Sequence, residues 1–572
     1  MRRAAVLAGL LLAAAATAPA AAAPVHQDSR FTASDGVTLA TTVTGEGPLS
    51  RRPVIVEFSP YGRASGTLDA GRAYNHLLVQ IRGTGDSDGR FDALGPRTQA
   101  DVVEVLRWAC RQPWSDGRLG LNGFSASAIT VYNSLHRELP CVRTAVLKSG
   151  THELYRDLLY PGGISNLVPG IGVLGLIGAP ATAQGFDRLG RAPTTSAEIA
   201  AGLFGAGLDG FMHSSLDSWW RERGIRGDVN HLPTLMIDGF FDVESRGAFQ
   251  AFQQLRHHGA HLLVIGAHDG APAGTDGGAR EARAWFDRYL RRVRNGIERT
   301  ARVKLWLADG DREDLLAGRY VRYSGRDWPI PGTRWTPLAL DPARSGTAHS
   351  INDGTLGVVR PRTSTTQSYP TVASLPTNSD PPNTAIIGPN GVNALAGAFP
   401  AATDMTAAET HGLSFTTRPL HADVLAAGPA SLELRLTTTT PGTGIWAVIS
   451  DVAPDGTPHP VASGRLNTDF PGVDRERSLT DRRTGAIVQP YGLYDHPEPA
   501  AAGQERLYRV ELWPIGNRFR AGHRVRLHIL GTSAASKPEE PALNTIRVGG
   551  PTGARLLLPA LPRGDFGRAL GG

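Results

Sequence analysis

Lysine and cysteine are both scarce in this chain of 572 residues, and each shortage argues against a class of function. Lysine occurs only at Lys148, Lys304 and Lys537, and the sequence has no dense basic run. The net charge of +6 is small for this length, so nucleic-acid binding has little support. Neither Cys110 nor Cys141 has a metal-ligating partner nearby in the sequence, which argues against a metal centre or a cysteine nucleophile. No metal, cofactor or nucleic acid is expected.

The N-terminus, residues 1–23, has the pattern of an export signal. Arg2 and Arg3 precede an Ala/Leu run that ends in small residues. The run is short and rich in alanine for a membrane anchor, which is the alternative interpretation. No cysteine follows the run, so a lipoprotein is not expected. We expect cleavage between Ala20 and Ala23, by the general or the twin-arginine route, and a secreted protein without membrane contact.

The two cysteines suggest a disulfide, because exported proteins form them readily. Cys110 follows the helical segment 101–108, and Cys141 is expected to end the helix that begins at Ser125. Two cysteines at neighbouring helix ends can be joined, and the alternative is a pair of buried free thiols. A Cα separation above about 7 Å would exclude the bond.

A chain of this length is too long for one hydrophobic core, so several domains are expected. Apolar runs alternate with helical patterns from about 54 to 290, which predicts a mostly parallel sheet with helices on both faces. After residue 300, short alternating strands predict an antiparallel β-sandwich, in which the polar stretch 363–400 is a long loop. The expected division is a signal peptide (1–23), an α/β domain (24–150 and 231–300), an inserted helical cap (151–230) and a β-sandwich (301–572).

Three short segments place polar side chains directly after apolar runs that are predicted to be buried strands. The runs are 119–121, 232–237 and 262–265. A serine, an acid and a histidine therefore follow strand ends in the order Ser, Asp, His, which is the order of α/β-hydrolases. In such a triad the imidazole takes the proton of the hydroxyl and makes it a nucleophile. The segments are Gly123-Phe124-Ser125-Ala126-Ser127, Gly239-Phe240-Phe241-Asp242 and Gly266-Ala267-His268-Asp269.

Each position of this triad has rivals. Ser125 is alternatively a helix N-cap, and Ser127 is a second candidate nucleophile, although it is expected inside the first helical turn. Asp242 and His268 are preferred because each follows a strand, where loops can meet. Asp238 is expected within a strand, and the other histidines lie in a polar helix end. The rivals are Asp238, Glu244 and Asp269 for the acid, and His257, His258 and His261 for the histidine.

Acyl transfer also requires hydrogen-bond donors for the charge that develops on the carbonyl oxygen. The N–H of the residue after the nucleophile, Ala126, is one candidate. A second donor should follow an early strand, and Tyr61 follows the apolar strand predicted at 54–58. From the residues alone, Tyr61 is equally well an aromatic turn residue.

Further motifs along the chain resemble those of one family, the cocaine-esterase-like and Xaa-Pro dipeptidyl-peptidase family of serine hydrolases. The resemblance covers nearly the whole mature chain in the right order. It implies an α/β-hydrolase domain, a helical cap and a C-terminal jelly-roll sandwich, and it implies that Tyr61 donates its hydroxyl to the oxyanion. The motifs are Pro60-Tyr61-Gly62-Arg63, Arg82-Gly83-Thr84-Gly85-Asp86-Ser87-Asp88-Gly89, Gln112-Pro113-Trp114-Ser115-Asp116-Gly117, Tyr155-Arg156-Asp157, Tyr160-Pro161-Gly162-Gly163, Gly239-Phe240-Phe241-Asp242 and Phe519-Arg520-Ala521-Gly522-His523-Arg524.

The chain departs from the family pattern at the nucleophile and at the acid. The family usually has Ser-Tyr-x-Gly at the nucleophile, whereas this chain has Ser125-Ala126-Ser127-Ala128. Alanine at 126 in place of the aromatic residue should leave a wider acyl pocket. Alanine at 128 in place of glycine adds a methyl group where the turn between strand and helix must pack tightly. The usual tryptophan of the Gly-Trp-x-Asp turn is Phe240.

The acids after Asp242 bear on the substrate class. Family members that accept α-amino substrates need an anion for the ammonium group, because burying an unpaired charge is costly. In the amino-acid ester hydrolases two acids closely follow the triad acid, whereas here only Glu244 matches and Ser245 does not. Because only one of the two acids is present, the sequence favours a carboxylesterase or amidase for short or aromatic acyl groups. The alternative is an Xaa-Pro dipeptidyl-peptidase in which Glu244 binds the amine.

A second class of function would use the β-sandwich alone, as a non-catalytic carbohydrate- or surface-binding protein. The presence of all three triad residues and of Tyr61 disfavours this class. Failure of the protein to react with any active-site phosphonate would favour it. The sequence makes no prediction about the oligomeric state.

Overall fold

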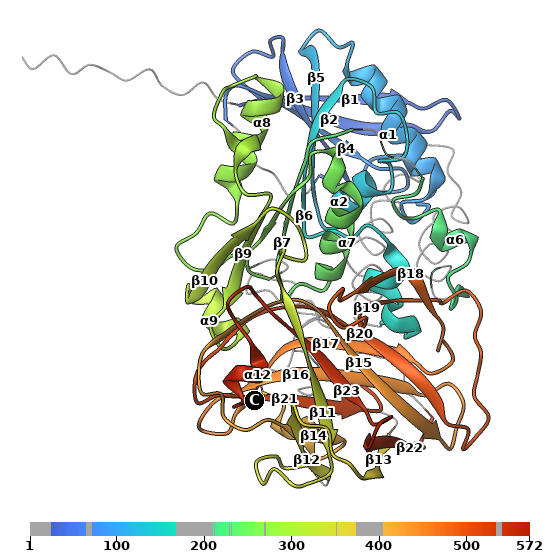
Figure 1. Cartoon of the computed structure of the whole chain (residues 1–572). Helices are drawn as coiled ribbons and strands as arrows, with labels where there is room; N and C mark the ends of the chain where they lie inside the picture. Colours follow the sequence, from blue (N-terminus) through green and yellow to red (C-terminus); the bar gives the residue numbers. More distant parts are fainter. Residues whose placement is uncertain are drawn as a thin grey trace, which may run out of the picture.

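The computed structural model describes residues 24–63, 71–166, 210, 212–227, 229, 231–267, 270–350, 352–372, 404–533 and 540–571. Figure 1 shows a helix-covered sheet in the upper half of the molecule and a β-rich C-terminal domain below it. The predicted signal peptide (1–23) and most of the predicted cap lie outside the described residues.

The upper half is built on one twisted sheet in the order β1-β2-β4-β3-β5-β6-β7-β8-β9-β10. The strands from β4 through β3 and on to β9 are parallel, which confirms the predicted parallel sheet. The strand bounds are β1 (Pro24–Thr32), β2 (Thr38–Glu46), β3 (Arg52–Ser59), β4 (Asn75–Gln80), β5 (Ser115–Phe124), β6 (Val142–Lys148), β7 (Thr234–Asp238), β8 (His261–Val264), β9 (Val303–Ala308) and β10 (Tyr320–Gly325).

Helices cover both faces of this sheet because successive residues of each buried strand point to opposite sides. Ile55, Leu235 and Leu263 pack with α8, whereas their neighbours Val56, Met236 and Leu262 belong to the core that contains α1, α2 and α7. The helix bounds are α1 (Pro96–Ala109), α2 (Ala126–Tyr132), α6 (Ser218–Arg221), α7 (Ser245–Leu255), α8 (Ala279–Leu290) and α9 (Arg312–Leu316); the short helical turns are Tyr155–Leu159, Pro161–Gly163, Arg256–His258 and Ile297–Arg299.

The sheet continues beyond the expected domain boundary at residue 300. Strand β9 pairs in parallel with β8, and β10 pairs with β9. Residues 303–325 therefore extend the α/β sheet into the range assigned to the sandwich. Burial alternates along β9, a pattern that a strand of a sandwich also gives.

The C-terminal domain is mostly antiparallel, as the alternating pattern predicts. The predicted strands 432–436 and 525–529 lie in β15 and β21. Its elements are β11 (Arg334–Asp341), β12 (Asn352–Gly357), β13 (Ser364–Thr371), α11 (Thr406–Glu409), β14 (Leu413–Thr416), β15 (Val424–Thr438), β16 (Gly444–Val452), β17 (Pro458–Asn467), β18 (Val473–Thr480), β19 (Ile487–Gly492), β20 (Arg506–Phe519), β21 (Arg524–Leu530), β22 (Ala542–Gly549), β23 (Arg555–Ala560) and α12 (Phe566–Ala569).

One stretch that was expected to be a loop is partly a strand. Residues Ser364–Thr371 form β13 and pair along their whole length with β22. The first residues of β13 are exposed, so a polar strand is tolerated there. Composition alone does not distinguish such a strand from a loop.

Cys110 and Cys141 form a disulfide, with their Cα atoms 6.1 Å apart. The expected position of Cys141 at a helix end is wrong, because α2 ends at Tyr132 and Cys141 directly precedes β6. Bonds between residues three apart replace the helical pattern after α2, as in Ser134 N–H to the Val131 carbonyl. The bond therefore joins the end of α1 to the start of β6.

We expect the disulfide to stabilise the fold by about 3 kcal/mol, because it closes a loop of 31 residues in the unfolded chain. Replacing both Cys110 and Cys141 by serine should lower the free energy of unfolding by that amount, measured in denaturant. Wild-type protein kept in reductant is the matched control and should show the same loss. Equal stability with and without the bond would contradict this expectation.

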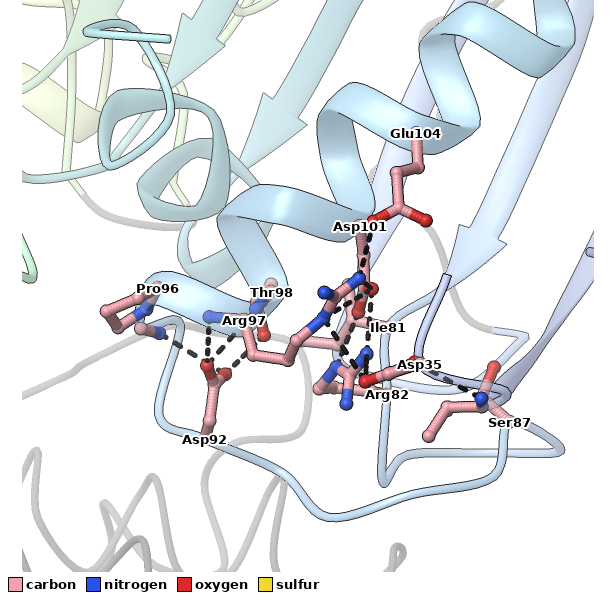
Figure 2. A network of polar contacts seen from close by, with 12 residues as sticks. Asp35, Ile81, Arg82, Ser87, Asp92, Pro96, Arg97, Thr98, Asp101 and Glu104 are labelled. Atoms are coloured by element: carbon pink, nitrogen blue, oxygen red, sulfur yellow. Dashed lines mark hydrogen bonds and ion pairs between the residues drawn. The ribbon is translucent and has the colours of Figure 1, made fainter. Parts of the chain in front are cut away.

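The Arg82 motif of the sequence fixes a loop to α1 and lies in a network of ion pairs (Figure 2). The buried Arg82 guanidinium binds Asp101 of α1 through two bonds, of 2.5 and 2.7 Å, and reaches Asp35 at 3.0 Å. Gly83 follows with a positive φ, and a Cβ there would lie 2.1 Å from the backbone nitrogen of Phe91. The motif therefore has a structural role in holding the loop after β4.

Candidate active site

Ser125 lies in the sharp turn between β5 and α2. Its backbone has φ 52° and ψ −125°, a conformation that is strained for a residue with a side chain. Strained backbone of this kind is typical of a nucleophile exposed between a strand and a helix. The Ser125 N–H donates to the carbonyl of Lys148 at the end of the neighbouring strand β6.

The turn packs tightly although the usual glycine is replaced by Ala128. A Cβ at Gly123 would lie 2.6 Å from the backbone of Ala128, and a Cβ at Gly150 would lie 2.7 Å from the Ala128 methyl group. The methyl group therefore occupies space that Gly150 leaves free. This answers the question that the missing glycine raised about packing in the turn.

Tyr61 follows β3 and lies beside the nucleophile. The Ala126 N–H donates to the Tyr61 hydroxyl oxygen at 3.2 Å, and the Ser125 side chain lies beside this hydroxyl. Burial, together with the nearby carboxylates of Glu244 and Glu57, raises the pKa of Tyr61 to about 12. The phenol therefore keeps its proton near neutral pH. The phenol can therefore donate a hydrogen bond to a bound oxyanion.

Asp242 is fully buried and follows β7 after the turn Gly239-Phe240-Phe241. Its Oδ1 accepts the N–H of Glu244 at 2.7 Å. Phe241 pairs with Ala267 in a parallel bridge, so the backbone that carries Asp242 runs beside the backbone that leads to residue 268.

A close approach of backbones supports this pairing. A Cβ at Gly239 would lie 2.1 Å from the carbonyl oxygen of Gly266, so glycine is required there. His268 and Asp269 themselves lie outside the described residues. Of the predicted triad, the structure thus places Ser125 and Asp242, at the ends of β5 and β7.

The rival nucleophile and histidines lie elsewhere. Ser127 is buried in the first turn of α2, where its hydroxyl donates to Glu57 at 3.3 Å. His257 and His258 lie after α7, and His261 begins β8, at the opposite end of that strand from residue 268. Burial, with the charges of Lys304 and Arg302, lowers the pKa of His261 to about 4.

Asp238, weighed as a rival acid, ends β7 next to Asp242. It is buried, and its Oδ1 accepts the N–H of Gly239 at 2.7 Å. Burial raises the pKa of Asp238 well above its usual value, and the neighbouring Asp242 raises it further. Asp238 is therefore held in its protonated form beside Asp242, which the sequence did not indicate.

We expect Asp238→Asn to keep kcat within about tenfold, because an uncharged amide has the shape of the protonated carboxyl, whereas Asp238→Ala should lower kcat further by leaving a cavity beside Asp242. The raised pKa means that wild-type stability declines as pH rises above 3.8, the usual aspartate value, towards the folded-state pKa. The asparagine variant has no such proton to lose. Its melting temperature relative to wild type should therefore increase between pH 4 and pH 7. A constant difference across this range would contradict the assignment.

A second buried acid near the site, Asp157, is already occupied by donors of the protein. Its carboxylate binds Arg246, Thr151 and His152, the last at 2.8 Å, and the Glu153 N–H at 3.1 Å. Burial alone would raise the pKa of Asp157, but the charges of His152 and Arg246 hold this pKa well below its usual value. Asp157 is therefore a partner of Arg246.

The site has no sign of a metal centre in the described part of the chain, where no three His, Cys, Asp or Glu side chains gather as metal ligands would. Within the same ranges, no helix is long and apolar enough to cross a membrane.

Comparison with known proteins identifies the family. Residues 35–269 match the X-Pro dipeptidyl-peptidase (S15 family) model, and residues 295–548 match the X-Pro dipeptidyl-peptidase C-terminal non-catalytic domain. The cocaine esterase of Rhodococcus sp. (strain MB1 Bresler) is 23% identical over 551 residues, which are 86% of this chain and 88% of that protein. The chain therefore belongs to the cocaine-esterase-like and X-Pro dipeptidyl-peptidase family of serine hydrolases.

Solved structures show the same fold. A CocE/NonD family hydrolase from Staphylococcus aureus superposes with a TM-score of 0.73 at 18% identity, covering 94% of each chain. An alpha-amino acid ester hydrolase superposes with a TM-score of 0.69 at 16% identity, covering 97% of this chain and 98% of that one. At these identities the likeness concerns the fold alone.

Proposed function

We propose that this serine hydrolase is a secreted carboxylesterase that uses Ser125, His268 and Asp242. One observation carries the proposal: the Tyr61 hydroxyl and the Ala126 N–H meet beside Ser125 in its strained turn. These are the parts that acyl transfer requires, a nucleophile with two hydrogen-bond donors next to it. No metal or cofactor takes part in the proposed reaction.

The reaction has two halves. Ser125 Oγ attacks the acyl carbon while His268 takes its proton, and Asp242 orients the imidazole. The carbonyl oxygen becomes negative and is held by Tyr61 and Ala126. The alcohol leaves with the proton from His268, and a covalent acyl-enzyme remains. Water then attacks this ester as His268 removes its proton, and the acid is released with Ser125 restored.

The charges near the site favour an acyl group without a free α-amine. Asp157 is bound by Arg246 and by hydrogen-bond donors, so it is not available to an ammonium group. Arg246 follows Ser245, where the amino-acid ester hydrolases have their second acid. Glu244 and Glu57 are buried carboxylates whose charges reach Tyr61, and Glu57 accepts the Ser127 hydroxyl. One acid after Asp242 in place of two supports an ester or amide of a short or aromatic acid over an α-amino substrate.

The alternative is an Xaa-Pro dipeptidyl-peptidase, favoured by the family model over 35–269 and by the buried Glu244.

Two further parts of the proposal concern export and the type of the C-terminal sandwich. The pattern of residues 1–23 and the disulfide support export. The antiparallel pairing of the C-terminal domain supports a jelly-roll sandwich.

The test compares a panel of nitrophenyl esters with Ala-Pro-nitroanilide. We expect the higher kcat/KM for the esters, and little change on them in Glu244→Gln. Glu313→Gln, an exposed carboxylate on α9, is the matched control. If the anilide has the higher kcat/KM and Glu244→Gln selectively loses it, the ester proposal is wrong and Glu244 binds the substrate amine.

A further inference from the structure

The turn that carries Asp242 is packed against β20, a strand of the C-terminal domain. Phe240, in the middle of this turn, is 1% exposed. A Cβ at Gly516 of β20 would lie 2.2 Å from two carbon atoms of the Phe240 ring. Gly516 does not have a positive φ, so glycine is needed there for space and not for backbone conformation. The ring lies directly on the backbone of β20.

A second contact joins β20 to the other side of Asp242. Arg246, in the first turn of α7, is 3% exposed, and its Nε lies 3.1 Å from both carboxylate oxygens of Glu511 in β20. The same guanidinium binds Asp157 through Nη1. Because these charges are largely buried, removing one would leave a partner without its opposite charge, which is costly. The pair therefore holds the start of α7 on β20.

The strand β20 is itself fixed to the hydrolase sheet. Asn517 pairs with Ala308 at the end of β9, and its side chain accepts the N–H of Gly310 at 3.2 Å. Arg518 binds both carboxylate oxygens of Asp309, through Nε at 2.6 Å and through Nη2. The strand therefore has a defined position relative to β7 and β8, whose ends carry the acid and lead to the histidine.

We propose that β20 positions the catalytic acid, with Phe240, Gly516, Arg246 and Glu511 as positioning residues. Asp242 lies between Phe240 and Arg246 in the sequence, and both neighbours rest on this one strand. The acid can therefore hold the imidazole only while β20 is in place. The C-terminal domain, whose family model is described as non-catalytic, thus supplies part of the active-site framework. The inference rests on the proposed role of Asp242.

The experiment introduces the missing Cβ. Gly516→Ala should push the Phe240 ring away and lower kcat on a nitrophenyl ester by about 10- to 100-fold, with KM little changed, because small misplacements of catalytic groups are costly. Phe240→Leu in the same chain makes room, and the double variant should return to within about threefold of Phe240→Leu alone. Gly357→Ala in β12 is the matched control, since nothing lies within 4 Å of its Cβ and kcat should not change.

A purely structural role for this contact would give a different result. Melting temperatures are measured for every variant, and kinetics are run well below them. If Gly516→Ala lowers the melting temperature but leaves kcat within twofold of wild type, the proposal is overturned. Should Gly516→Ala fail to fold, Glu511→Gln keeps the shape and removes the charge, and it should lower kcat at least threefold. An unchanged kcat in Glu511→Gln would then overturn the proposal.

The rate of labelling by a fluorophosphonate separates this inference from the proposed function. If wild type is not labelled at Ser125, the proposed function fails and the inference falls with it. If wild type is labelled and Gly516→Ala reacts equally fast, only the positioning role of β20 is rejected. Slower labelling of Gly516→Ala, restored in the double variant, is the result we expect.

Discussion

Ser125→Ala should remove esterase turnover almost completely, with kcat lower by a factor on the order of 10⁴ to 10⁶. The loss is large because the hydroxyl forms the covalent intermediate, and the other members of a triad act only through it. The variant should fold normally. Alanine at φ 52° is strained to the same extent as serine, and the neighbouring packing of Ala128 is untouched.

The matched control is Ser127→Ala, two residues further along. Ser127 is buried and its hydroxyl contacts Glu57, so this variant should lose some stability but keep its activity and its labelling by a phosphonate. Mass spectrometry of the labelled peptide identifies the modified serine. Label on Ser127, or turnover that survives in Ser125→Ala, would reject the assignment of the nucleophile.

The strands and their ends could be predicted because their signals are local. Each run of apolar residues before Ser125, Asp242 and residue 268 forms a strand of the sheet, in β5, β7 and β8. The period of the hydrophobic pattern and the turn that follows are contained within about ten residues. A parallel sheet then brings the carboxyl ends of these strands to one edge, so the site could be located without knowledge of its contacts.

The long-range contacts had no such signal. Nothing near Phe240 in the sequence indicates that it rests on Gly516, and the role of Gly162 is equally hidden: a Cβ there would lie 2.0 Å from the carbonyl oxygen of Arg465 in β17. Glycine within a strand, as at Gly516, does mark a close approach of another segment, but not which one. Asp238 was expected in its strand, yet its altered protonation follows from burial, which spacing does not reveal.

The end of the α/β sheet has no local signal for a related physical reason. Burial alternates along β9, and the same pattern is produced by a strand of a sandwich. Pairing with β8 decides between them, and pairing is a tertiary property.

Tyr61→Phe should lower kcat by about 10²- to 10³-fold with little change in KM, because it removes one of the two donors to the oxyanion while leaving the aromatic ring in place. The remaining activity would depend on the Ala126 N–H. This N–H no longer has the phenolic oxygen as its acceptor in the variant.

The pH dependence makes this prediction specific. Because burial raises the pKa of Tyr61 to about 12, the phenol is protonated at every pH up to about 10 at which the enzyme would be assayed. Wild type and Tyr61→Phe should therefore give pH–rate profiles of the same shape, displaced by a constant factor. Tyr320→Phe, a tyrosine stacked on Trp306 in β9, is the matched control and should keep full activity. If Tyr61→Phe retains wild-type kcat, the hydroxyl does not stabilise the oxyanion. If the two profiles differ in shape, Tyr61 titrates during catalysis and is not a constant donor.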